Sequence, residues 1–196
     1  MKRIILFCAA ALLLTAAPLS SSIAQGQAPT RSTVIKVNVL SPFAATGSGF
    51  IEHAFGPHIS GQVGAFITGV SVSGVRFDGY GFTPEVRYYV SDYKAAPAGL
   101  YLAGYGRILN YKLTVQDKDQ GKEYKATYAP IGAGIAAGNQ FIFNNGISVD
   151  IFLGAGINGG SLKVNSGTEE DFDTGFLNLL GSGFRLRPGL TVGYSF

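Results

Sequence analysis

The end of the chain alternates strictly between apolar side chains and small or polar ones, and this period of two constrains the fold more than any other feature. From 184 to 196, successive even positions carry Phe184, Leu186, Pro188, Leu190, Val192, Tyr194 and Phe196. The odd positions carry Arg185, Arg187, Gly189, Thr191, Gly193 and Ser195. Successive side chains of a β-strand point to opposite faces, whereas a helix repeats every 3.6 residues. The segment is therefore predicted to be a strand with one apolar face.

Seven earlier segments show the same period. They cover residues 34–40, 49–55, 59–68, 81–90, 100–108, 129–135 and 147–158. Eight strands are an even number, which can close as an antiparallel up-and-down barrel. Pro84, Pro130 and Pro188 fall within these strands and are interpreted as bulges or rim positions, because a closed barrel has no free edge. The predicted fold class is all-β, an eight-stranded transmembrane β-barrel.

The polar faces of these strands carry charged residues that can pair inside a barrel. They are Glu52, Glu85, Arg87, Arg107, Arg185 and Arg187. We interpret them as a structural network that fills the barrel, with a narrow pore as the alternative, because eight strands leave little lumen. Only 14% of the residues are charged. A soluble, lipocalin-like barrel would turn a glycine-rich, sparsely charged face to water, so the apolar faces are predicted to contact lipid.

The lengths of the links between strands alternate. The links at 56–57, 91–98 and 138–146 are short or moderate and are predicted to be periplasmic. The links at 41–48, 70–74, 116–123 and 159–183 include the longest polar stretches and are predicted to face outward. Aromatic residues at the inner rim are predicted to be Phe55, Tyr88, Tyr194 and Phe196.

Residues 1–24 have the pattern of a secretory signal peptide. A basic start, Met1-Lys2-Arg3, precedes the apolar run 4–19 and the small residues 22–24. Cleavage is predicted between Ala24 and Gln25, leaving a short lead, 25–32, and a barrel domain, 33–196. Cys8, the one cysteine, lies in the signal, so the mature chain has no thiol chemistry. The remaining charges nearly balance, and nothing indicates nucleic-acid binding.

No catalytic, cofactor or metal residues emerge from the pattern. His58-Ile59-Ser60 has the His-x-Ser order of outer-membrane lipid deacylases, but it follows a predicted periplasmic turn and has no third group to orient the base. The acidic residues Glu169, Glu170, Asp171 and Asp173 lack the alternating ligand spacing of an EF-hand and are interpreted as a solvated loop.

The ending 190–196 resembles the terminal strand of outer-membrane barrels. In that group a C-terminal Phe and alternating apolar residues form the assembly signal; here these are Leu190, Val192, Tyr194 and Phe196. The runs 35–40 and 84–89 resemble an uncharacterised family of small bacterial outer-membrane β-barrels, with a looser similarity to OmpA/OmpX-type barrels. The resemblance implies an integral outer-membrane protein with extracellular loops, and three partners: membrane lipid, lipopolysaccharide and the barrel-assembly machinery.

The function expected from these observations is structural or surface-interacting, without enzymatic activity and without a cofactor. A small pore or transport protein is the first alternative. An outer-membrane lipid-modifying enzyme and a secreted soluble lipocalin-like binder are the others. The surface ligand and protein partner stay open.

Overall fold

A computed structural model describes residues 31–72, 75–116, 123–160, 162–166 and 183–196. The predicted signal peptide, the cleavage position between Ala24 and Gln25, most of the lead, and the acidic residues of the last link lie outside the described residues.

The described residues form ten strands and one short 3-10 helix. In chain order these are β1 (Thr33–Asn38), η1 (Ser41–Ala44), β2 (Thr46–Ala54), β3 (Ile59–Val72), β4 (Val75–Tyr89), β5 (Gly99–Gln116), β6 (Glu123–Tyr128), β7 (Ile131–Ile142), β8 (Ile147–Gly159), β9 (Leu162–Ser166) and β10 (Gly183–Ser195). No helix among these residues is long and apolar enough to span a membrane.

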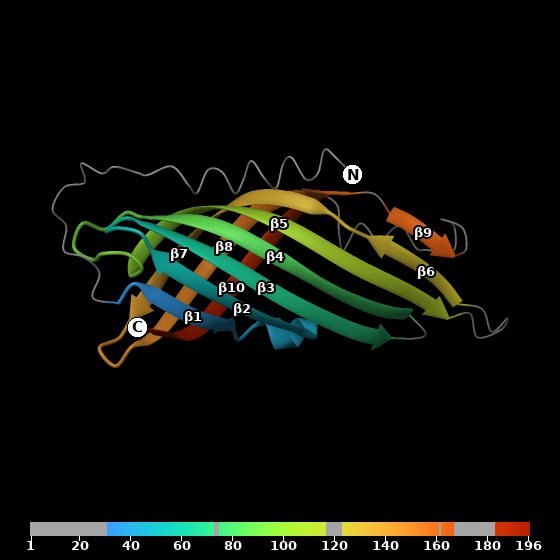
Figure 1. Ribbon diagram of the computed structural model, residues 1–196, viewed down its shortest axis with the longest axis horizontal. Helices are drawn as coiled ribbons and strands as arrows, with labels where there is room; N and C mark the ends of the chain where they lie inside the picture. The colour runs from blue at the N-terminus through green and yellow to red at the C-terminus, as the bar shows by residue number, and fades with distance from the viewer. Residues whose placement is uncertain (1–30, 73–74, 117–122, 161, 167–182) are drawn as a thin grey trace.

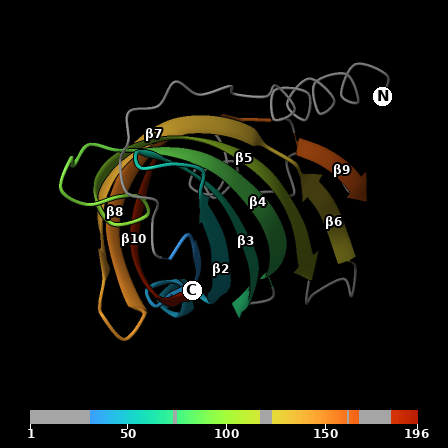
Figure 2. The same cartoon turned by 60° about the vertical axis from the view of Figure 1, so that its left-hand side comes forward.

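Eight of the strands close into an antiparallel barrel. The order around the ring is β1-β2-β3-β4-β5-β7-β8-β10, and β10 pairs with β1 to close it. β5 pairs with β7 along 99–108 and with β6 along 111–116. β6 and β7 therefore lie end to end along the same edge of β5. β9 continues in the same way beside β6. Figure 2 shows the strands curving around a common interior, with β6 and β9 beyond it.

The barrel has two different ends, visible at the left and right of Figure 1. The proximal end, on the left, holds Thr33, the links 55–58, 90–98 and 143–146, and Phe196. The distal end, on the right, holds η1, β6 and β9. The expected link at 138–146 is shorter than predicted, because β7 continues to Ile142, and β5 extends eight residues beyond its predicted end at 108.

Each of the three strand prolines lies where pairing is interrupted. Pro130 separates β6 from β7. Pro84 pairs with β3, but β4–β5 pairing is broken between Phe82 and Glu85, on the side where its missing N–H would point. The last backbone hydrogen bond between the β1 segment and β10 runs from Val39 N to Leu190 O. Pro188 lies two residues beyond Leu190 in the direction away from this bond, where β1 has already ended. A residue without an N–H is tolerated at such breaks.

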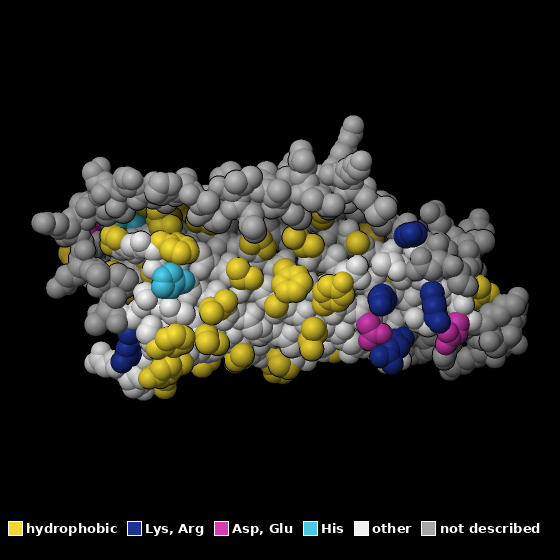
Figure 3. Space-filling model, viewed as in Figure 1, with side chains coloured by type: hydrophobic (Ala, Val, Ile, Leu, Met, Phe, Trp, Pro, Cys, Tyr) yellow, Lys and Arg dark blue, Asp and Glu magenta, His cyan; other side chains and the backbone are white. Residues whose placement is uncertain are grey.

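The faces of the barrel are apolar outside and polar inside. Most large apolar side chains on the outer face are exposed, with fractions of 51–72% for Ile51, Val86, Leu102, Ile135 and Leu186. Figure 3 shows them as a yellow band over the middle strands, with charged side chains gathered beyond it at the right. The inner face carries buried charges such as Glu52, Glu85 and Arg87. This arrangement is the opposite of a soluble barrel with an apolar interior.

The distal extension, residues 75–80 of β4, 109–116 of β5 and β6, reverses this distribution. Its inner face is an apolar cluster of Phe77, Leu109, Tyr111, Leu113, Ala126 and Tyr128. Its outer face carries exposed charges: Arg76 donates to Asp78 at 2.7 Å, a hydrogen bond that lowers the pKa of this carboxyl. Lys112 lies opposite Asp78 on the neighbouring strand.

Candidate functional site

The most distinctive site is a network of buried charges near the proximal end of the lumen. Lys36 projects inward from β1, and its Nζ lies 2.5 Å from Glu52 Oε2 and 3.3 Å from Asp150 Oδ2. The same ammonium donates to Gln140 Oε1 at 2.6 Å. Its stem passes Gly193, where an added Cβ would come within 2.7 Å of Lys36 Cγ. The glycine on β10 therefore makes room for the lysine between two strands.

Arg87 joins this lysine to the middle of the lumen. Its Nη1 lies 2.9 Å from Asp150 Oδ2 and 3.3 Å from Glu52 Oε2, and its Nε donates to Glu85 Oε1 at 2.7 Å. Its guanidinium also lies 4.2 Å from the centre of the Tyr101 ring. The second oxygen of Glu85 accepts from Arg187 Nη1 at 2.6 Å.

The network balances three cations, Lys36, Arg87 and Arg187, against three carboxylates, Glu52, Glu85 and Asp150. Hydroxyl groups satisfy the remaining oxygens. Ser60 and Tyr89 donate to Glu52 Oε1 at 2.5 and 2.7 Å, and Tyr101 donates to Asp150 Oδ1 at 2.9 Å. Buried charges are tolerated when they are paired and hydrogen-bonded in this way.

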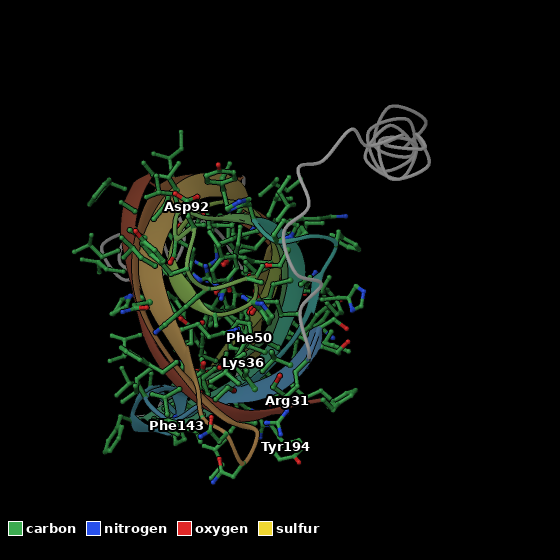
Figure 4. All side chains as sticks on the ribbon, turned by 90° about the vertical axis from the view of Figure 1, so that its left-hand side faces the viewer. Arg31, Lys36, Phe50, Asp92, Phe143 and Tyr194 are labelled. Atoms are coloured by element: carbon green, nitrogen blue, oxygen red, sulfur yellow. The ribbon has the colours of Figure 1, made fainter. Side chains whose placement is uncertain are left out.

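The link between β4 and β5 packs against this network at the proximal end. Ala96 and Pro97 are buried, and Ala96 N donates to Pro57 O at 2.7 Å. Gln140 donates to Pro97 O at 2.5 Å while it accepts from Lys36. Figure 4 looks into this end: Lys36 and Phe50 lie inside the ring, and Phe143 and Tyr194 lie at its edge. Link and network are thus in direct contact through Gln140.

The distal half of the lumen contains a cavity of about 450 Å³. Phe50, Phe66, Phe77, Tyr111 and Phe152 form much of its apolar lining, and Arg107 and Arg187 are its charged residues. The size falls within the range of small-molecule sites, about 300–1,000 Å³.

The structure brings together four of the six predicted interior residues, Glu52, Glu85, Arg87 and Arg187. Arg107 and Arg185 lie further toward the distal end, where the positive charges of Arg187 and Arg185 repel that of Arg107. The role of all six as a stabilising plug stays a prediction.

Sequence reasoning missed several members of the network. These are Lys36, Ser60, Tyr89, Tyr101, Gln140 and Asp150. Each falls on the inner face of its strand, so the alternation was a usable signal for all of them except Gln140, which lies in the predicted link 138–146. The alternation does not indicate which inward residues meet, because that depends on the register around the ring.

The other singled-out residues have different surroundings. His58 Nδ1 lies 3.0 Å from the Tyr89 carbonyl oxygen, while Ser60 donates to Glu52, so the two side chains do not form a nucleophile–base pair. The predicted assembly-signal residues lie on the outer face of β10 and, for Phe196, directly after its end. They are Leu190, Val192, Tyr194 and Phe196.

Comparisons place the chain among known proteins. The model of a family described as "Protein of unknown function (DUF3575)" matches residues 8–164. No curated protein matches. A crystal structure of Acinetobacter baumannii CarO2 has a TM-score of 0.47 and 14% identity, covering 87% of this chain and all of that one. The N-terminal β-barrel domain of Pseudomonas aeruginosa OprF has a TM-score of 0.44 and 17% identity, with the same coverage.

Proposed function

We propose that this chain, which belongs to the DUF3575 family, is an integral outer-membrane β-barrel with a structural or surface-interaction role and a lumen closed to through-flow. One observation carries the proposal: on three adjacent strands the apolar outer face ends within one outward position of the same level.

That level can be followed across β3, β4 and β5. Ile67 of β3 and its partner Tyr80 of β4 are the last large apolar residues on the outer face of their strands. On β5 the last is Ile108, one outward position before Asn110, which pairs with Tyr80. Two residues further along each strand from this paired row, the outward positions become Gly69, Asp78 and Lys112. A common boundary across neighbouring strands is expected where a barrel leaves a bilayer, because charged side chains on the lipid face are costly in the hydrocarbon region.

The proximal boundary is rich in aromatic side chains. Phe55, Tyr88, Phe143, Tyr194 and Phe196 are 53–70% exposed there. Aromatic girdles mark the interfaces of membrane barrels. Along β4 and the residue that follows it, the outward positions are apolar from Tyr80 to Val90, a span close to the roughly 9–11 residues that a tilted membrane strand needs.

We place the proximal end in the periplasm and the distal end outside the cell. Residues 1–24 would then act as a signal peptide cleaved after Ala24, and the outer face of β10 would be read by the barrel-assembly machinery. The exposed Arg76, Lys112 and Lys125 would meet lipopolysaccharide phosphates, since all three lie beyond the apolar band.

The pore alternative has less support, because the side chains of Lys36, Glu52, Arg87 and Asp150 are wholly buried across the proximal lumen. Planar-bilayer recordings test it: the closed barrel should give no steady conductance. Steady channels in the native protein that are also recorded with a folded Arg87→Gln barrel would favour the pore.

Cell fractionation tests the membrane assignment. The protein should enter the outer-membrane fraction and migrate differently on a denaturing gel before and after boiling. A soluble protein without this mobility change would overturn the proposal.

Orientation is tested with single cysteines: Lys112→Cys should react with an impermeant maleimide on whole cells, whereas Tyr93→Cys, on an exposed proximal link, should react only after lysis. The reverse labelling would invert the assigned orientation.

A further inference from the structure

The barrel wall has an interruption near its distal end, between β2 and β10. β1, which separates these strands, ends at Asn38, and the last backbone bond on this side runs from Val39 N to Leu190 O at 2.9 Å. Among the described residues, 183–189 of β10 pair only with β8, and 46–48 of β2 pair only with β3. The helix η1 follows β1 in the chain and leads back to β2 at this place.

The distal cavity passes through this interruption. Its inner lining includes Phe50 and Phe66, which project into the lumen. Its lining also includes Leu186 and Pro188, which lie on the outer face of β10, and Leu40, which lies in the turn between β1 and η1. A cavity lined by residues from both faces of the sheet connects the lumen sideways to the surroundings of the apolar band.

Two arginines at the inner end of the cavity have unused donors. Among the described residues, Arg107 has no carboxylate partner, and its Nε is buried without a hydrogen-bond acceptor. Arg187 uses Nη1 for Glu85, but its Nη2 is also buried without an acceptor. The guanidinium of Arg187 is held 4.8 and 4.7 Å above the rings of Tyr105 and Phe152. Buried donors without acceptors are costly, and an anion would satisfy both.

We propose that this cavity binds a single-tailed amphipathic anion of the long-chain carboxylate class. The carboxylate accepts hydrogen bonds from Arg107 and Arg187. Its negative charge also offsets the repulsion between these two positive side chains. The chain lies along Phe50 and Phe66 and leaves the wall between η1 and β10. This exit into the outer leaflet depends on the proposed function, whereas occupation of the cavity does not.

The chain contains no tryptophan, so a single introduced indole can report on the cavity. Phe50→Trp places it in the lining, and Leu102→Trp places it on the outer face of β5, away from the cavity. The folded barrel is reconstituted in phosphatidylcholine nanodiscs and titrated with 12-bromododecanoate, whose bromine quenches nearby indole fluorescence. Saturable quenching is expected for Phe50→Trp, and only gradual quenching from lipid partitioning for Leu102→Trp.

The head group is tested separately. Arg107→Gln in the Phe50→Trp background should weaken the saturable binding about tenfold or more, because a hydrogen bond to a charged group contributes about 1.5–3 kcal/mol. Arg76→Gln, on the exposed outer face, is the matched control and should leave it unchanged. Neutral 12-bromododecanol should give no saturable phase.

Equal gradual quenching at both indoles would overturn the proposal. So would an unchanged affinity in Arg107→Gln. Heat-dependent mobility of each variant on a gel confirms that the barrel is folded, so a failure of binding is distinguished from a failure of the membrane assignment.

Discussion

Strands β4 and β5 pass through two regions with the same alternation and the opposite chemistry. In the body of the barrel, Leu102 points outward and Tyr101 and Arg87 point inward. In the distal extension, Lys112 points outward and Leu113 points inward. Pairing between the strands resumes after the break at Pro84 and continues to Val75 and Val115, so one hairpin carries both patterns.

The reversal shows that backbone geometry sets the alternation of side chains, whereas the surroundings of the strand set which of its two faces is apolar. A strand requires only that alternate side chains share a face. Which face is apolar depends on what surrounds it. In the extension the outer face is charged, as expected in water, and the apolar residues pack inward as Phe77 does against Tyr111 at 4.9 Å. In the body the outer face is apolar, which suits lipid.

The largest expected effect comes from breaking the charge network inside the body. Arg87→Ala leaves Glu52, Glu85 and Asp150 buried with fewer cations, and removing one partner of a buried pair costs about 3–5 kcal/mol. Denaturant unfolding in detergent micelles measures the change in the free energy of unfolding.

Arg76→Ala is the control for Arg87→Ala. It removes an ion pair of the extension whose side chains are 66% and 42% exposed, and it should leave unfolding unchanged. Equal stability of both variants would show that the interior network contributes nothing to the barrel.

A charge placed on the outer face should separate body from extension. Leu102→Lys is expected to cost about 2–4 kcal/mol in a lipid-reconstituted barrel, the range for a lysine near the middle of the bilayer. Lys112→Leu on the same face of the same strand should have little effect on unfolding. If Leu102→Lys is as stable as the native chain in lipid, the outer face of the body is not in hydrocarbon.

Packing inside the body can be tested at a glycine that lies against a tyrosine. A Cβ at Gly138 would come within 2.5 Å of Tyr101 Oη, so Gly138→Ala should overpack the interior and cost about 1–3 kcal/mol. Gly104→Ala on the outer face meets nothing within 4 Å and should not destabilise the barrel. Equal unfolding midpoints for the two variants would contradict the close packing of Tyr101.

The smallest effect on global unfolding is expected in the extension. Leu113→Ala removes an apolar side chain from a cluster outside the closed ring, so the cost should appear as local opening. Hydrogen exchange should speed up in residues 109–116, with the global free energy of unfolding changed by less than about 1 kcal/mol. Thr114→Ala on the outer face is the control. A global loss of about 2–5 kcal/mol, typical of Leu→Ala in a core, would show that extension and body unfold together.

Much of the fold could be predicted from alternation alone. The pattern at 184–196 and 147–158 identified two strands and their outward faces, because period two fixes side-chain direction without any knowledge of neighbours. It failed where a strand continued beyond its regular pattern. β5 reaches Gln116, eight residues beyond the predicted end at 108, although its outward residues after Ile108 are polar, namely Asn110, Lys112 and Thr114.

The candidate site was less predictable. The sequence placed Glu85 and Arg87 together in the barrel interior, because two residues that are two positions apart on one strand point to the same face. Lys36 and Asp150 are 114 residues apart, and they meet only because β10 pairs with both β1 and β8. Register around a closed ring depends on all eight strands at once, so no single segment encodes it.

The sequence by itself determined the eight strands of the ring and which of their positions face inward, because these follow from local spacing; it did not indicate β6 or β9. Only the tertiary structure decided which charges pair, that Ala96 and Pro97 of the link between β4 and β5 are buried beside the charge network, and that β1 stops pairing with β10 after Asn38. Those features depend on distances between segments far apart in the chain, and such distances are fixed only when the barrel closes.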